Sequence, residues 1–316
     1  MRTKILSLSV ILAMGLFSCE TSDDVSVLSS GNESVLKSTE IATSDILVES
    51  VCEEADYEAE FFTYSEKILR EISHLTGRHN GLINAKKLRH YNFGNCPDVA
   101  IDTAETGYPI TITLDYGDST ELKNGKVLSG IIIIEITGDK NTDGAKRTVT
   151  YNDFTVDSVG VAGTMTHLFT SDNDATRIVT ISGTLVFTLP DGTTITRTSE
   201  KVREWLAGID TPLEHDDDEI QVTGKVETTT SAGESFSKVI TVPLLKNDSC
   251  KDYVQGVVQY IQNGTMLAEL NYGDGECDGV ATLTTSDGET VEIDLSGDKP
   301  TANNSNNGHK RSKGKN

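Results

Sequence analysis

The sequence predicts a mainly β protein. We expect an antiparallel meander of about twelve strands that forms a long bent sheet or a sandwich, with one N-terminal amphipathic helix. Apolar residues alternate with Thr and Ser over residues 109–296; in one such stretch Ile181, Leu185 and Phe187 share a face. Turn signals such as Pro190-Asp191-Gly192 recur between these stretches. Strands joined by short turns usually pair with each other, which makes a meander the expected order.

The chain opens with a short basic start that contains Arg2 and Lys4, and an apolar stretch follows from Ile5 to Phe17. This stretch is too short to cross a bilayer as a helix, which needs about 20 apolar residues. We therefore expect residues 1–18 to be a secretory signal peptide.

The end of this segment, Leu16-Phe17-Ser18-Cys19, resembles the lipobox of bacterial lipoproteins. The resemblance implies cleavage before Cys19 and a lipid such as palmitate on that residue. Each buried CH₂ of an acyl chain contributes about 0.8 kcal/mol, so several chains anchor a protein durably. An ordinary secretory signal with an unrelated Cys is the alternative.

The acidic run that follows the cysteine, residues 20–24, resembles the surface-export signal of Bacteroidota lipoproteins. The resemblance implies a protein anchored in the outer membrane and exposed on the cell surface, with the periplasmic side as the alternative. Residues 19–48 as a whole are rich in Ser, Thr, Asp and Glu and show no sustained period. We interpret them as a lipidated, flexible tether.

Residues 49–108 are expected to form one helix and a loop. Glu53 provides an acidic first turn, Phe62 and Leu69 recur at helical spacing, and Gly77 is a natural stop. A break is expected near Thr63. The β domain then runs from residue 109 to residue 296.

A repeated pattern, apolar–polar–Gly–x–apolar, indicates how the sheet is shaped. Its glycines fall on the same strand face as the apolar residues around them. A Gly inside a strand weakens it unless a bulge, a bend or a bulky neighbour requires the space. The pattern predicts a sheet that bends repeatedly, or aromatic rings over the glycines, at Gly130, Gly163, Gly183, Gly224 and Gly256.

Charge excludes one class of partner. The chain has 49 Asp and Glu against 27 Lys and Arg, a net charge of −22, so it offers nucleic acid no basic face. Its 36% hydrophobic content also excludes a disordered polyanion. Residues 297–316, rich in Asn, Ser, Gly and Lys, are expected to be a disordered basic tail.

Four cysteines remain besides Cys19, and an even number in an exported protein predicts two disulfides. Three pairings are possible. The sequence favours Cys250 with Cys277, because both flank strands of one hairpin region, which leaves Cys52 for Cys96. Cysteine and histidine do not gather at zinc-ligand spacing.

Motifs of known chemistry are lacking. The sequence has no nucleophile elbow, no HExxH and no phosphate-binding Gly loop, so we expect no cofactor and assign no catalytic residue. Asp139, Asn141 and Asp143 fit the first half of a calcium loop. The second half fails, because Arg147 and Thr150 stand where oxygen ligands are required.

These features predict a lipid-anchored cell-envelope protein with a non-catalytic binding, adhesion or structural role. Its partners would be the membrane, through the lipid, and a glycan or an envelope protein. One alternative is an envelope hydrolase or glycan-acting enzyme, which a deep cleft with close carboxylates and a His would favour. The other alternative is an adhesion module that bound calcium stabilises.

Overall fold

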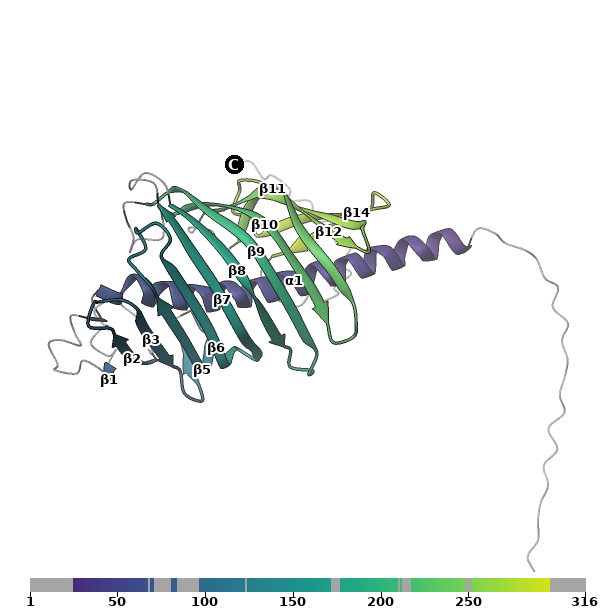
Figure 1. Cartoon of the computed structure of the whole chain (residues 1–316). Coiled ribbons are helices and arrows are strands. Elements are labelled where there is room, and N and C mark those ends of the chain that lie inside the picture. The colour runs from purple at the N-terminus through teal and green to yellow at the C-terminus, as the bar shows by residue number, and fades with distance from the viewer. Residues whose placement is uncertain are drawn as a thin grey trace, which may run out of the picture.

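The computed structural model describes residues 25–67, 69–70, 81–83, 97–122, 124–171, 177–209, 211, 217–247, 250 and 252–295. Within these residues the chain forms one long helix and fifteen strands (Figure 1). The expected signal peptide, Cys19, Cys96 and the expected basic tail lie outside the described residues.

The helix, α1, runs from Val25 to Tyr64 and precedes every strand. The first strands are β1 (Gly81–Ile83), β2 (Asp98–Thr103), β3 (Ile110–Asp115), β4 (Thr120–Glu121) and β5 (Val127–Ile136). The long central strands are β6 (Lys146–Val156), β7 (Val159–Ser171), β8 (Arg177–Thr188), β9 (Thr194–Ala207), β10 (Glu219–Thr230) and β11 (Ser235–Asn247). The last strands are β12 (Tyr253–Gln262), β13 (Thr265–Asp274), β14 (Val280–Thr285) and β15 (Thr290–Asp294).

The predicted antiparallel meander is confirmed. In the described residues, fourteen strands follow one another across a single sheet in chain order, and β4 pairs only with β5. Every strand pair is antiparallel. The sheet is open, because β1 and β15 stand at opposite ends of this order. It includes β2, so the sheet starts before the expected boundary at residue 109.

The helix is longer than expected and begins earlier. A flexible tether is predicted over residues 19–48, whereas the structure is helical from Val25. Ile41, Ala42 and Ile46 are buried in this part of the helix. The helix is interrupted by a turn at Ser65, close to the break predicted near Thr63, and residues 66–67 and 69–70 are helical again.

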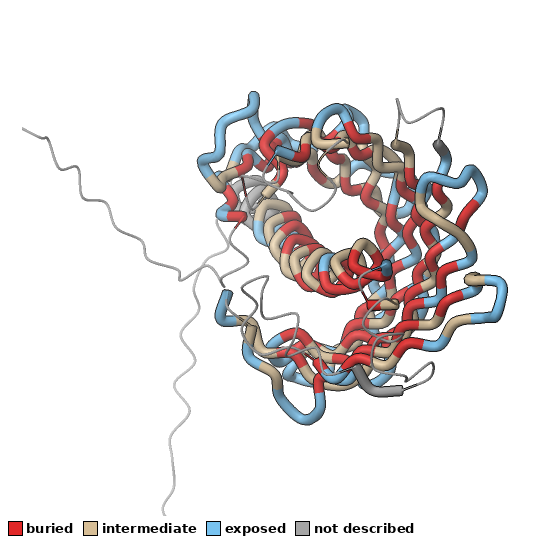
Figure 2. Tube along the Cα trace, turned by 90° about the vertical axis from the view of Figure 1, so that its left-hand side faces the viewer, coloured by how far each residue is buried: buried red, intermediate tan, exposed pale blue. Residues whose placement is uncertain are grey.

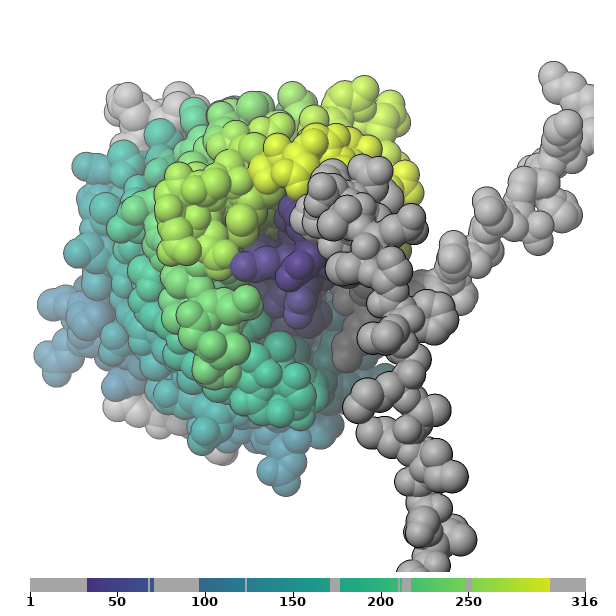
Figure 3. Space-filling model, turned by 90° about the vertical axis from the view of Figure 1, so that its right-hand side faces the viewer, coloured from purple at the N-terminus to yellow at the C-terminus, as the bar shows by residue number. Residues whose placement is uncertain are grey.

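The sheet curls around α1 as an open C, and the buried residues of both elements face each other (Figure 2). Figure 3 shows the molecule from the other side, along the helix, and the end of the helix lies in the hollow that the curved sheet forms. Small residues bring the helix close to its surroundings, since Ala42, Ala55 and Ala59 are fully buried. The apolar core therefore lies between the helix and the concave face of the sheet.

Glycines permit this curvature, as the repeated pattern predicts. A Cβ atom on Gly224 of β10 would lie 2.2 Å from the carbonyl oxygen of Glu200 in β9, and φ there is +123°. A Cβ atom on Gly163 of β7 would likewise lie 2.3 Å from the carbonyl oxygen of Thr184 in β8. The β10–β11 register also shifts between Val222 and Lys225, across Gly224. At these positions the backbone of the neighbouring strand lies so close that only a residue without a side chain fits.

Candidate functional site

The interior of the C is charged along one face of the helix. Asp45, Glu49, Glu53, Asp56 and Glu60 follow one another at spacings of three or four residues, which places them on the same face. Asp45 is 3% exposed, and Glu49 and Asp56 are each 8% exposed. Buried carboxylates require cations or hydrogen-bond donors, and the sheet provides them.

The cations come from the concave face of strands β6 to β11. Strand residues alternate between the two faces, so Arg197, Lys201 and Arg203 of β9 all point inward. The other inward basic residues are Arg147 of β6, His167 of β7, Arg177 of β8, and Lys238 and Lys246 of β11.

One group of ion pairs is centred on Glu49. Its Oε2 lies 2.7 Å from Arg197 Nη2 and 2.9 Å from Lys238 Nζ, and its Oε1 pairs with Lys201. Asp45, one turn earlier, lies 3.0 Å from Arg197 Nη2 and 2.8 Å from Lys238 Nζ. Burial alone would raise the pKa of Glu49, but Lys201, Lys238 and Arg197 outweigh burial and hold that pKa well below its ordinary value.

A second group is centred on Asp56. Its Oδ1 lies 2.9 Å from Arg147 Nη2 and 3.0 Å from His167 Nε2, and its Oδ2 lies 2.7 Å from Arg203 Nη1. Burial opposes ionisation here too, but His167, Arg147 and Arg203 lower the pKa of Asp56 well below its ordinary value. On the same face of the helix, Glu53 and Glu60 pair with Lys246 and Arg177, so this face of α1 is tied to five strands, β6 to β9 and β11.

A small cavity lies beside these groups, under the helix and over β6 to β9. It is partly open to solvent and has room for only about one water molecule. Its lining includes Cys52, Asp56, Tyr151, Met165, His167 and Lys201. Nε2 of His167 faces Asp56, whereas Nδ1 has no hydrogen-bond partner among the described residues, which suits a water molecule in this space.

The cavity brings a thiol, an imidazole and carboxylates together, but it does not activate them. Burial, and then the charge of Glu49, raises the pKa of Cys52 to about 11, so its thiol is protonated at neutral pH and a poor nucleophile. Burial, and then Arg147, lowers the pKa of His167, and Asp56 opposes this only in part. Glu49 and Asp56 are held by three basic side chains each. The arrangement locks the helix to the sheet.

The partial calcium motif forms an ordinary turn between β5 and β6. The Oδ1 atom of Asp139 accepts a hydrogen bond of 3.0 Å from the backbone N–H of Asn141, and its Oδ2 pairs with Lys67 at 2.9 Å. Asn141 and Asp143 are exposed. Among the residues that the structure describes, no three His, Cys, Asp or Glu side chains gather as metal ligands.

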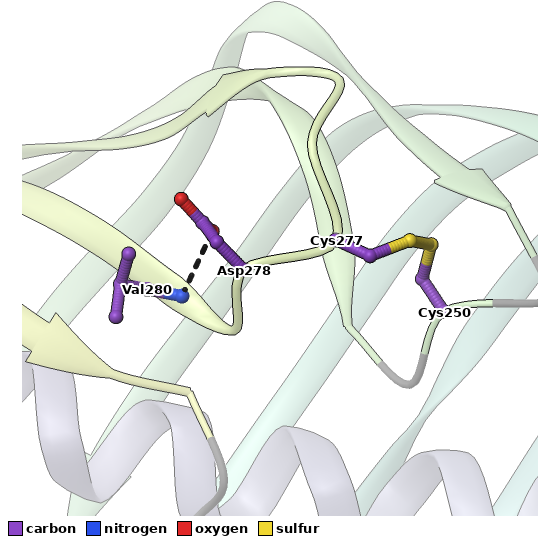
Figure 4. Close-up of a disulfide and its surroundings, with 4 residues drawn as sticks. All are labelled: Cys250, Cys277, Asp278 and Val280. Atoms are coloured by element: carbon purple, nitrogen blue, oxygen red, sulfur yellow. Dashed lines mark hydrogen bonds between the residues drawn. A yellow bond between two sulfur atoms is a disulfide. The ribbon is translucent and has the colours of Figure 1, made fainter. Parts of the chain in front are cut away.

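Of the two predicted disulfides, the structure contains the one between Cys250 and Cys277 (Figure 4). Their Cα atoms are 5.7 Å apart, and the bond joins the β11–β12 loop to the loop after β13. Beside it, Asp278 Oδ1 accepts a hydrogen bond from the backbone N–H of Val280. Cys52 has no disulfide partner among the described residues, and its pairing with Cys96 stays a prediction.

Comparison with protein families, with curated proteins and with solved structures finds no match to this chain. In the described part of the chain, no helix combines the length and the apolar character that a membrane span requires.

Sequence reasoning missed the charged interior, although two signals of it were present. The helical spacing of Asp45, Glu49, Glu53, Asp56 and Glu60 was one. The other was strand β9, where basic residues occupy the face that apolar residues occupy in neighbouring strands. Each signal alone is typical of a solvated surface, and only the fold shows that the two face each other.

Proposed function

We propose that this protein is a lipid-anchored component of the outer membrane, exposed on the cell surface, with a non-catalytic binding, adhesion or structural role. The observation that carries the proposal is the course of α1. The helix starts at Val25, six positions after Cys19, and then runs through the curved sheet, to which its acidic face is tied. A lipid on Cys19 would thus hold the folded domain through a stiff element.

The connection between lipid and helix is short. Only residues 20–24 separate Cys19 from the helix, and five extended residues reach no farther than about 18 Å. The N-terminal end of α1 would therefore stay close to the membrane surface. Lys37, near this end, donates a 2.9 Å hydrogen bond to Gln262 at the end of β12. At the opposite end, Lys67 lies three positions after the last residue of α1 and pairs with Asp139.

From β2 onward, the strand connections differ between the two ends. At the Gln262 end, the turns after β6, β8, β10, β12 and β14 contain two to five residues. At the Asp139 end, the connections after β2, β5, β7, β9, β11 and β13 contain five to eleven residues. Longer loops on a rigid scaffold are where binding residues concentrate. In the anchored protein these loops would point away from the membrane, toward a glycan or another envelope protein.

The ion pairs and the protonation of the side chains that line the cavity favour a non-catalytic role over an envelope hydrolase. The carboxylates of Glu49 and Asp56 are held by neighbouring basic groups, and the Cys52 thiol is protonated. A hydrolase of either kind needs a free general base or an activated nucleophile. The room for about one water molecule also leaves little space for a substrate.

The anchor is tested by metabolic labelling with a palmitate analogue, in the wild type and in Cys19→Ala. We expect label in the wild type and its loss in the variant, with the variant released from the membrane fraction. Equal labelling of both proteins would refute the anchor. Treatment of intact cells with a protease tests the side of the membrane, since only a surface protein is cleaved without lysis.

A further inference from the structure

We propose a binding site for a small oxyanion, a carboxylate or phosphate group, at the loop end of the molecule, formed by Lys140, Arg177, Tyr64 and Trp205. The site gives a ligand class to the binding role proposed above and rests on it. It lies beyond Asp56 and the cavity, at the C-terminal end of α1.

The four side chains come from four elements and stack on one another. Lys140, in the β5–β6 connection, places Nζ 3.6 Å from the ring centre of Tyr64, at the end of α1. Arg177, at the start of β8, places Cζ 4.8 Å from the same ring and 4.0 Å from the ring of Trp205, near the end of β9. Two cations are therefore held against aromatic faces, and the Tyr64 ring contacts both of them.

These cations lack the close ion pairs that the other inward basic residues have among the described residues. Arg147, Arg197, Arg203, Lys238 and Lys246 each lie within 2.9 Å of a carboxylate oxygen. By contrast, Lys140 has no carboxylate within 4.0 Å in the described part of the chain.

Among the described residues, Arg177 has one carboxylate within ion-pair distance, Glu60, whose Oε1 is 3.3 Å away. That oxygen already accepts a 2.7 Å hydrogen bond from the Tyr64 hydroxyl. Asp218 also attracts both cations, but among the described residues no ion pair as short as those of the other inward basic residues holds either of them.

Donor groups are also left without acceptors. The Nε of Arg177 and the indole Nε1 of Trp205 are buried and form no hydrogen bond, and Trp205 is 5% exposed. An unsatisfied buried donor is unfavourable, and in native proteins such a group calls for a water, an ion or a ligand. An oxyanion has several acceptor lone pairs and fits the planar edge of a guanidinium.

The two cations are in an environment that disfavours their charge. Burial lowers the pKa of Lys140 to about 8, despite the nearby Glu60 and Asp139. Burial also lowers the pKa of Arg177, more than Glu60 compensates. A bound anion would supply the missing charge. Arg197 and Arg203, which have close carboxylates, show the opposite direction, with raised pKa values.

The chain contains a single Trp, so intrinsic fluorescence reports on this site alone among all positions. The test titrates the protein, without its lipid, with sodium glucuronate, with inorganic phosphate and with glucose at constant ionic strength set by sodium chloride. We expect a saturable change in Trp205 fluorescence with glucuronate or phosphate, matched by calorimetric heat, and no change with glucose. The two anions distinguish a carboxylate ligand from a phosphate ligand.

The variants are Lys140→Met, Lys140→Arg and Lys225→Met. Lys225 is an exposed lysine of β10 that pairs with Glu200 of β9, five positions before Trp205 along that strand. We expect at least tenfold weaker binding in Lys140→Met, near wild-type binding in Lys140→Arg and unchanged binding in Lys225→Met. The proposal is overturned by equal binding in the two Met variants, or by the absence of both fluorescence change and heat. Neither result bears on lipid labelling of Cys19, so the two proposals fail separately.

Discussion

Glu49 shows at the scale of one residue what holds the helix in place. Its two oxygens meet Arg197, Lys201 and Lys238 from strands β9 and β11, in a site where water is nearly excluded. A buried ion pair of this kind adds little net stability compared with apolar packing, because desolvation offsets the attraction. Removing one partner is different, since it leaves the other charges buried and uncompensated.

We therefore expect Glu49→Gln to lower the free energy of unfolding by about 3–5 kcal/mol, measured by urea denaturation at pH 7. The matched control is Glu227→Gln, an exposed residue of β10 whose nearest cation, Lys225, is 4.0 Å away. That change is expected to stay below about 0.5 kcal/mol. Similar losses in both variants would show that the Glu49 cluster is not a constraint on the fold.

Glu58, on another face of the helix, is a buried carboxyl group that forms no ion pair with the residues that the structure describes. It is 7% exposed, and its partner is the hydroxyl of Tyr116, which donates a hydrogen bond to it. Burial raises the pKa of Glu58 to about 7; the Tyr116 hydrogen bond lowers it, and the charge of Glu54 adds to the increase. The folded protein therefore holds a proton that the unfolded chain releases above about pH 4.3.

The sign of the pH dependence follows from this difference. Between about pH 4.3 and pH 7 the folded state binds more protons at Glu58, so its contribution to stability falls as the pH rises. Glu58→Gln cannot titrate and keeps an acceptor for Tyr116. We expect its stability relative to wild type to improve by on the order of 2–3 kcal/mol from pH 4.5 to pH 8, measured by denaturant unfolding. The exposed Glu234→Gln should show no such trend, and a flat Glu58→Gln difference would contradict the assignment.

At the scale of single elements, the strands were predictable and the helix only in part. Alternation of apolar and polar residues and Gly-containing turns are local signals, and they predict the meander correctly. The helix start was missed because the groups that bury its polar residues are remote in sequence. Glu49 and Lys238, for example, are 189 positions apart. A Ser-, Thr- and Glu-rich segment read alone is typical of a linker.

The sequence predicts where the sheet bends, but it does not predict toward which face the sheet bends. The glycine pattern marks residues such as Gly163 and Gly224, where the structure brings the neighbouring carbonyl within 2.3 Å of a virtual Cβ. Nothing local to a strand says toward which face the sheet will curl, because that depends on where the helix docks. For the same reason, the cluster of Lys140, Arg177 and Trp205 could not be assembled from sequence spacing.

The close approach at Gly224 predicts a large effect for a small substitution. Gly224→Ala places a methyl group against the backbone of β9 at a φ of +123°, so strain and a steric clash add. We expect a loss of more than about 3 kcal/mol in thermal or urea unfolding, or failure to fold. Gly233→Ala isolates the backbone term, since φ there is +84° with open space around the virtual Cβ. That control should lose only about 1 kcal/mol, and equal losses would argue against the close approach.

At the scale of the whole molecule, helix and sheet form one folding unit. The concave face exposes apolar residues and a row of cations once α1 is removed, among them Arg147, Arg197 and Lys238. The helix alone would carry a row of carboxylates and an apolar stripe with nothing to pack against. Each part therefore lacks both the apolar burial and the charge partners that it needs.

A chain that starts at residue 97 is accordingly expected to show no cooperative thermal unfolding, because its concave face cannot be buried. Adding a peptide of residues 25–70 should restore a cooperative transition, followed by differential scanning calorimetry. The control peptide carries Asp45→Asn, Glu49→Gln and Asp56→Asn, which keep size and helical pattern but remove three buried charges. We expect it to restore little or nothing, since Arg147, Arg197 and Lys238 would then be buried without counter-ions. Cooperative unfolding of the sheet without any peptide would instead mean that the helix is an accessory to a self-sufficient domain.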